Sequence, residues 1–437
     1  MRFYKNYVAL ILLLALTLNW VVEGSNYLGK VDMNLNLFPK FSIMVVEVFQ
    51  FLVLLRLLLL YPRNRFIMAS TVAVAVFCVF EFMVFMAVKA DPLVWVSGIR
   101  YYFSFFPLLL IAYLLASNGY SLKREFNWLM LLVLFQVPVA VYQFFNLSDI
   151  QIVNDRQLLY DIISGTMGGI ASNLMSLVIG IALLYFLIKF VEEKRPLYIV
   201  LACLLVVPPI LAEAKGMLIV IFIVLLYLAF VYKFSLSRFL LLGGLATLLL
   251  VGFNYTYTLL GYGEPITLTY LIDYVQSESG GGRLSRIDSI VHSFSLLSNN
   301  DTLFLGMGIG NANKSPLGQD GQYYDFYTIR HSIDILVAET GLLGIVLFSF
   351  LIARMIWVSR SLLKNKYGML QKDELLLTRV FLGSVFVFIY GLFWVDVLYR
   401  VQFMYPFGMM AGYVIGLHAR VNAVEEPEEA LQYQLQK

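Results

Sequence analysis

The feature that most constrains this chain is a series of long apolar runs. A helix needs about 20 mostly apolar residues to cross the hydrocarbon core of a bilayer. Such runs recur along all 437 residues and predict an all-α polytopic membrane protein of about twelve spans. The predicted spans are residues 7–23, 41–60, 67–88, 99–116, 127–145, 171–190, 196–212, 217–232, 239–256, 333–357, 375–395 and 402–418.

The composition excludes several classes of protein. Hydrophobic residues make up 60% of the chain and charged residues 14%, whereas soluble domains carry about 25% charged residues. A net charge of +3 is too balanced for a polyanionic partner, so we expect no binding to nucleic acid. The two cysteines, Cys78 and Cys203, lie inside apolar runs and cannot form a disulfide framework or a metal cluster.

Basic residues set the expected orientation, because cytoplasmic loops are rich in lysine and arginine. One alternate set of connections is the richer one and holds Arg2, Lys5, Arg63, Arg65, Lys123, Arg124, Lys189, Lys194, Arg195, Lys233, Arg238, Arg360, Lys364, Lys366, Lys372, Arg420 and Lys437. Both termini are therefore expected in the cytoplasm. No small-x-small cleavage pattern follows the first run near Val21–Ser25, so that run is predicted to be a signal anchor.

One external connection, residues 257–332, is much longer than the others, and loops of that length are uncommon unless they are functional. We expect a single membrane domain, residues 1–437, with its chemistry at this loop. Glycines at 280–282 precede a predicted surface helix that starts at Arg283. Its apolar residues recur from Leu284 on one face, and Asp288, Ser289 and His292 lie on the opposite, polar face. Such a helix lies on the membrane with its apolar face down.

Three residues of the external side are candidates for chemistry. Arg283, at the start of the surface helix, suits a lipid-linked phosphate because its fork donates two hydrogen bonds; the alternative is an arginine that reaches ordinary headgroups. His331 begins the tenth predicted span, where a helix N-terminus favours the neutral ring of a general base; the alternative is a histidine that only caps or packs. Lys215 lies in a very short turn beside Glu213, as a functional group or as that residue's ion-pair partner.

Other strings have simpler interpretations. Gly306-Met307-Gly308-Ile309-Gly310 lacks a βαβ context, so it predicts a tight turn rather than a dinucleotide site. The aromatic segment 323–327 would stack on sugar rings or belong to an interfacial belt. Glu47, Glu81 and Asp396 are candidate intramembrane charges without an evident partner; the alternatives are functional polar sites and charges that snorkel or pair internally. No group of residues has the spacing of a zinc site, so no metal or other cofactor is expected.

In their order along the chain, these features resemble the O-antigen ligase/polymerase family of membrane proteins. The strings that carry the resemblance are Ala214-Lys215-Gly216, Gly282-Arg283, residues 303–310, residues 166–173 with Ala171-Ser172-Asn173 at their end, and His331-Ser332 followed by residues 336–344. Two strings depart from the usual pattern of the family. Lys215 stands where the family has arginine and loses the bidentate fork, and Ser332 stands where the family has asparagine.

The resemblance implies transfer of a glycan from undecaprenyl diphosphate to an acceptor sugar hydroxyl, on the outer face of a bacterial cytoplasmic (inner) membrane and without a nucleotide sugar. His331 would activate the hydroxyl, and Arg283 and Lys215 would hold the diphosphate. Arg286 and Arg330 complete the expected substrate-binding set. Direct displacement would invert the anomeric carbon. The expected partners are the lipid-linked glycan, membrane lipids and a chain-length regulator protein.

The function expected from this resemblance is polymerisation of repeat units for O-antigen, capsule or exopolysaccharide. The alternative within the same chemistry is a ligase that transfers the polymer to lipid A–core of lipopolysaccharide. The alternative from another class is a transporter of lipid-linked glycan, which would use Glu47, Glu81, Glu213 and Lys215 as polar sites at the midplane.

Overall fold

In the residues that it describes, the computed structural model has helices as its only regular secondary structure apart from turns. The described residues are 2–28, 37–88, 91–153, 163–168, 171–232, 285–313, 331–365 and 369–435, with Gly321 and short pieces between 243 and 269. No strand occurs in these parts of the chain. Helices are the expected structure in lipid, because a helix satisfies its own backbone hydrogen bonds where no water is present.

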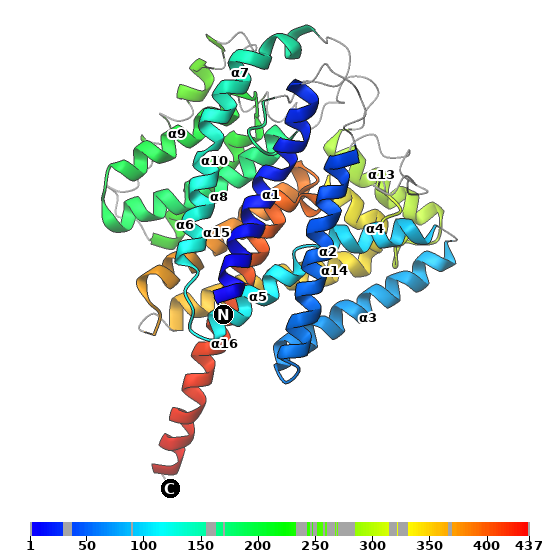
Figure 1. The fold of residues 1–437 in the computed structure, drawn as a ribbon, viewed down its shortest axis with the longest axis vertical. Helices are drawn as coiled ribbons and strands as arrows, with labels where there is room; N and C mark the ends of the chain where they lie inside the picture. The colour runs from blue at the N-terminus through cyan, green and yellow to red at the C-terminus, as the bar shows by residue number, and fades with distance from the viewer. Residues whose placement is uncertain are drawn as a thin grey trace.

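Figure 1 shows the order of the helices. They are α1 (Arg2–Leu28), α2 (Leu37–Leu60), α3 (Arg65–Ala87), α4 (Pro92–Phe103), α5 (Phe106–Ser117), α6 (Lys123–Leu134), α7 (Gln136–Val153), α8 (Ser172–Glu193), α9 (Leu197–Leu211), α10 (Gly216–Tyr232), α13 (Arg286–Asn299), α14 (Ser332–Asn365), α15 (Lys372–Trp394), the 3₁₀ turn η3 (Val397–Tyr399) and α16 (Val401–Leu435). The N-terminus and the C-terminal end of α16 both lie in the lower half of this view.

The predicted apolar runs fall on these helices, except for residues 239–256, half of which lie outside the described part of the chain. Two runs are interrupted, one between α4 and α5 and the other between α6 and α7. By length and composition, six segments can cross a membrane: Arg65–Ala87, Pro92–Ser117, Lys123–Asn146, Ser172–Glu193, Ser332–Lys364 and Lys372–Trp394. Shorter apolar helices accompany them. Helices long and apolar enough to cross a membrane are thus confirmed in the described residues, while the number of twelve stays a prediction.

The centre of the bundle is built around α5 and α16, which make the most extensive helix–helix contact. Glycines on α16 allow their backbones to approach closely. A Cβ on Gly412 would lie 2.0 Å from the carbonyl oxygen of Leu109, and a Cβ on Gly416 would lie 2.4 Å from that of Tyr113. Small residues four positions apart are the usual means of close packing between membrane helices. Helices α8 and α15 pack together in the same core.

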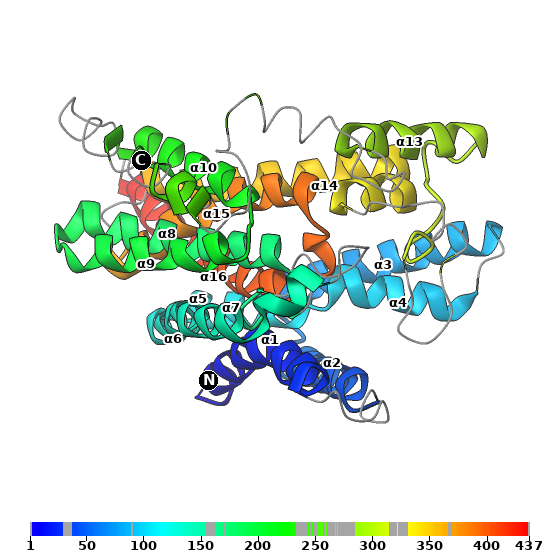
Figure 2. The same ribbon diagram turned by 90° about the horizontal axis from the view of Figure 1, so that it is seen from above.

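The outer helices and one end of the bundle determine where the candidate site lies. Helix α3 keeps most of its apolar side chains exposed, as expected for a helix that faces lipid. Figure 2 shows α13 alongside the first half of α14. Helix α15 ends at Trp394, and α14 begins at Ser332. The backbone N–H of Ser332 donates to the carbonyl oxygen of Val395 at 3.0 Å, so the turn after α15 and the start of α14 meet at the same end of the bundle.

Candidate functional site

Helix α13 is the predicted surface helix, but its packing differs from the prediction. Ser285 caps its N-terminus and accepts a hydrogen bond from the backbone of Asp288. The buried face carries Ser289, Ser293 and Leu297, so the expectation of a solvated face around Ser289 was wrong. Contact with α14 covers these small serines and leaves Ile287 and Val291, 49% and 58% exposed, pointing away from the protein. That exposed apolar stripe is the face expected to lie on a membrane.

His331 lies directly before the first residue of α14, as predicted, and is buried to 3% exposure. Its Nδ1 is 3.0 Å from Oδ2 of Asp334, one turn into the helix, and its backbone N–H donates to the same oxygen at 3.3 Å. The hydroxyl of Ser289 on α13 donates to this oxygen at 2.6 Å. With Nδ1 directed at a carboxylate, Nε2 is the ring nitrogen left for proton transfer.

Ser332 fixes the position of His331 in the bundle. Its backbone N–H donates to the carbonyl oxygen of Val395, and its hydroxyl accepts from the backbone of Leu398 at 2.9 Å. Both partners belong to the turn between α15 and α16. The residue beside the candidate base is therefore anchored to the turn that joins α15 to α16.

Arg286 lies over the aromatic ring that ends α15. Its guanidinium carbon is 4.1 Å from the centroid of the Trp394 ring, within the range of a favourable cation–π contact. The indole also donates, through Nε1, to Oδ1 of Asn173 at the start of α8, at 3.2 Å. Trp394 is 6% exposed, so the stack holds the arginine in a defined place.

Trp394 also contacts the turn that carries Lys215. A Cβ on Gly216 would lie 2.5 Å from Nε1 of Trp394 and 2.8 Å from the hydroxyl of Tyr390, so only glycine fits at this position. Tyr390 donates to the carbonyl oxygen of Gly216 at 3.2 Å. The strings around residues 173, 216, 286 and 331, which are far apart in the sequence, are thus joined through the end of α15.

Lys215 forms the ion pair that was the alternative to a functional role. Its Nζ is 3.4 Å from Oε1 of Glu213, and the two side chains are 16% and 23% exposed. Glu213 has a positive φ of 55°, which closes the short turn between α9 and α10. The pair keeps a cation in the turn that packs against Trp394.

The glycine string 306–310 forms the predicted tight turn, with positive φ at Gly306, Gly308 and Gly310. It packs against a break in α14 at Gly341, where φ is 61° and ψ is −160°. Backbone N–H groups of residues 307 and 308 donate to the carbonyl oxygens of residues 338 and 339, and those of residues 342 and 343 donate to residues 303 and 304. This exchange satisfies the backbone groups that the break sets free, as buried backbone requires.

A buried carboxylate lies beneath this turn. Oε1 of Glu339 accepts from the backbone of Ala312 at 3.1 Å and from Nδ2 of Asn313 at 2.9 Å. Nearby, the hydroxyl of Tyr399 donates to that of Tyr102 at 3.2 Å. Burial raises the pKa of Tyr399 well above its usual value, so the hydroxyl stays a neutral donor. These contacts hold the turn against α4 and α14 and stabilise the end of the bundle that carries His331.

The intramembrane charges have partners that the sequence did not reveal. Arg100 Nε donates to Oε1 of Glu47 at 2.5 Å, and Arg400 Nη2 is 2.8 Å from Oδ2 of Asp396. Glu81 accepts from the backbone of Ile309 in the glycine turn. Internal pairing, one of the two alternatives expected for these acids, is thus what the structure shows for Glu47 and Asp396. Local pairing and turn stabilisation account for them without a transport pathway.

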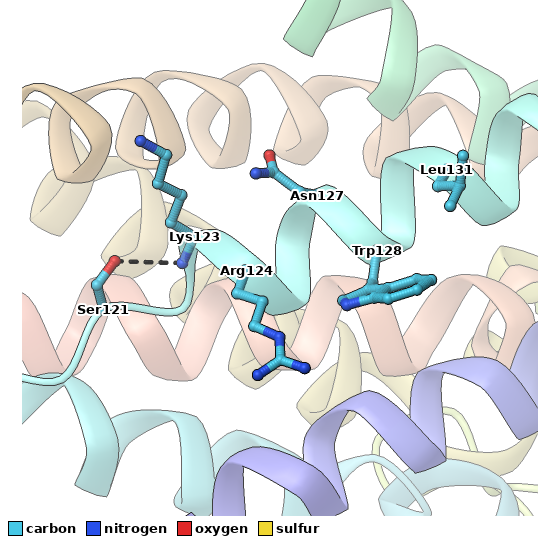
Figure 3. Close-up of a pocket in the computed structure, with 6 residues that line it drawn as sticks. All are labelled: Ser121, Lys123, Arg124, Asn127, Trp128 and Leu131. Atoms are coloured by element: carbon cyan, nitrogen blue, oxygen red, sulfur yellow. Dashed lines mark hydrogen bonds between the residues drawn. The ribbon is translucent and has the colours of Figure 1, made fainter.

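A separate open pocket lies at the other end of the bundle (Figure 3). It is lined by Ser121, Lys123, Arg124, Asn127, Trp128 and Leu131. Nζ of Lys123 is 2.8 Å from Oδ2 of Asp373, in the first turn of α15, whereas Trp394 ends that helix. At 1.5 Å per residue these ends are about 33 Å apart. The pocket is therefore remote from His331 and forms no part of the candidate site.

Sequence reasoning found some residues of this site and missed others. His331, Lys215 and Arg286 lie at the same end of α15, whereas Arg283, Arg330 and the aromatic segment 323–327 fall outside the described residues. Asp334 was missed although its spacing of three residues after a histidine at a helix start is a usable signal. Ser289 and Trp394 were missed because their partners are distant in the sequence.

The histidines, cysteines and acids of the described residues give no indication of a metal site. Among the described residues, no group of three or more histidines, cysteines and acids is placed to hold an ion. In comparisons with known proteins, no family model and no curated sequence matches this chain.

Proposed function

We propose that this protein polymerises oligosaccharide repeat units carried on undecaprenyl diphosphate. The observation that carries the proposal is the buried His331–Asp334 pair at the start of α14, beside a turn that joins Arg286 to Asn173 and Gly216 through Trp394. A base and two cations at one end of a membrane bundle suit an acceptor hydroxyl and an anionic, lipid-linked leaving group.

In the proposed reaction, Nε2 of His331 takes the proton of an acceptor sugar hydroxyl. The oxygen attacks the anomeric carbon, the bond from that carbon to the diphosphate oxygen breaks, and its electron pair leaves with undecaprenyl diphosphate. The imidazolium that forms lies opposite the carboxylate of Asp334, which stabilises it. Arg286 and Lys215 offset the charge on the departing diphosphate, together with Arg283 and Arg330.

This displacement inverts the anomeric carbon and needs neither a nucleotide sugar nor a metal. The exposed stripe at Ile287 and Val291 supports a position of α13 in the headgroup layer, where a polyprenyl diphosphate would present its charge. We place the reaction on the outer face of a bacterial inner membrane, with both termini in the cytoplasm.

The test uses purified protein in liposomes with a synthetic undecaprenyl-diphosphate repeat unit, a chelator and no nucleotide sugar. Products are separated by size. We expect a ladder of chain lengths, with the new linkage inverted relative to the donor by NMR. A single transfer that appears only after lipid A–core is added would instead identify a ligase. No product in either assay from well-folded protein would contradict glycosyl transfer and support the transporter alternative.

A further inference from the structure

One carboxylate oxygen organises the surroundings of His331. Oδ2 of Asp334 accepts hydrogen bonds from the Ser289 hydroxyl at 2.6 Å and from the backbone N–H of His331 at 3.3 Å, and it lies 3.0 Å from Nδ1 of His331. The side chain of Asp334 is fully buried, and that of His331 is 4% exposed. Three polar contacts to one buried oxygen leave the carboxylate little freedom to rotate.

This arrangement selects one form of the imidazole. A neutral histidine carries its proton on one nitrogen, and a carboxylate partner at Nδ1 selects the tautomer with the proton there. The lone pair then lies on Nε2. If Asp334 rotated away, the ring would lose this bias, and a large share of the molecules would present a protonated Nε2 that cannot accept a proton.

Ser289 connects this carboxylate to the helix that carries Arg286. The two residues are three positions apart on α13 and so lie on neighbouring parts of one face. Arg286 stacks on Trp394, while Ser289 donates to Asp334. A shift of α13 that follows phosphate binding at Arg286 would therefore act directly on the Ser289–Asp334 hydrogen bond.

We propose that Asp334 and Ser289 are positioning residues that hold His331 with Nε2 unprotonated, and that Ser289 links this state to the helix that binds the donor. The inference rests on the proposed glycosyl transfer. Neither residue contacts the reacting atoms in this scheme. Asp334 acts by orienting the ring and by facing its positive charge after proton transfer, and Ser289 acts by orienting Asp334.

Steady-state kinetics test the role of Ser289 against a closely matched control. Ser293 lies one turn further along the same buried face, and its hydroxyl donates to the carbonyl oxygen of Ser289 rather than to Asp334. Ser289→Ala should lower kcat about tenfold and leave the KM for the lipid-linked donor within about twofold. Ser293→Ala should retain the wild-type kcat. Equal kcat values for the two variants would overturn the role of Ser289.

Asp334→Asn preserves the volume of the side chain and removes its charge. We expect kcat to fall by a factor on the order of 10⁴, as for loss of the carboxylate in a histidine–aspartate pair, again with little change in donor KM. A variant with wild-type kcat would overturn the role of Asp334. Thermal unfolding of each variant separates this effect from loss of folded protein.

Nitrogen NMR tests the tautomer without any assay of activity. The chain has three histidines, so selective ¹⁵N-histidine labelling in liposomes gives few signals, and His331→Gln assigns the one of interest. We expect the neutral His331 ring to carry its proton on Nδ1. A proton on Nε2 would overturn the inference. Because this readout needs no substrate, it separates failure of the positioning role from failure of the proposed function.

Discussion

The guanidinium of Arg286 stacks 4.1 Å above the ring of Trp394, the last residue of α15. Trp394 is in turn bonded to Asn173 and packed on Gly216. A guanidinium held over an indole ring keeps its donors in a defined place, and its planar fork suits a phosphate group. This relationship links the surface helix to three other segments that the proposed site requires.

Arg286→Lys keeps the charge and removes both the fork and the planar stack. We expect the KM for the lipid-linked donor to rise about tenfold, since a hydrogen bond to a charged group contributes about 1.5–3 kcal/mol, and kcat to fall as well, because the guanidinium also offsets the charge on the departing diphosphate. The matched control is Arg354→Lys, which removes a similar stack over Trp357 at 4.3 Å in the second half of α14. A donor KM for Arg286→Lys no different from that of the control would argue against phosphate binding.

Lys215 offers a second test of the cation set, because its pairing with Glu213 and its proposed role toward diphosphate predict different results. Lys215→Met should raise the donor KM roughly tenfold through loss of a charged contact. Lys215→Arg introduces a bidentate fork and should keep or lower the donor KM. An unchanged donor KM in Lys215→Met would show that this lysine serves only as the ion-pair partner of Glu213.

The glycine turn should be sensitive to single methyl groups. A Cβ on Gly98 would lie 2.6 Å from the backbone carbon of Ile309, and neither backbone can move without breaking the packing of α4 on the turn. Gly98→Ala should lower the free energy of unfolding by about 1–3 kcal/mol, measured as a lower thermal midpoint in detergent. Gly252→Ala is the control, since no atom lies within 4 Å of its added Cβ. Equal midpoints would contradict the described contact.

The ion pairs of two adjacent acids at the start of α15, Asp373 and Glu374, should affect the stability of the protein but not its activity. Both oxygens of Glu374, which is 2% exposed, lie 2.8 Å from Nη2 of Arg420. Arg420→Gln should cost about 3 kcal/mol, because it leaves a buried charge without this partner. Lys123→Gln removes the exposed pair with Asp373 and should cost less than about 1 kcal/mol. Both variants should retain the wild-type kcat per folded molecule, because this end of α15 is remote from His331; a lower kcat for either variant would contradict that separation.

Hydropathy was sufficient to predict helices over most of the apolar runs, because length and composition determine whether a segment can cross a membrane. It could not predict the break at Gly341, since that break depends on hydrogen bonds to residues 303–308. Amphipathicity predicted the existence of α13 but assigned its serine face to solvent. Small side chains allow close contact with α14, and this tertiary packing decided the orientation.

The residues of the candidate site were likewise only partly predictable from the sequence. The position of His331 at a helix start was visible in the sequence, and Asp334 three residues later could have been noticed. The bond between Ser289 and Asp334 joins residues 45 positions apart, and the bond between Trp394 and Asn173 spans 221 positions. Neither partner has a local sequence signal, because each is selected only by the packing of the whole bundle.

The most direct measurement is the rate of sugar-chain growth by His331→Gln in liposomes that contain the synthetic lipid-linked repeat unit and a chelator. His418→Gln is the control, because His418 packs against Trp357 and Asn422, away from the proposed site. If His331 is the general base, its variant should grow chains about 10²–10⁴-fold more slowly than the wild type, and the control should match the wild type. Wild-type growth by His331→Gln would contradict the proposed mechanism.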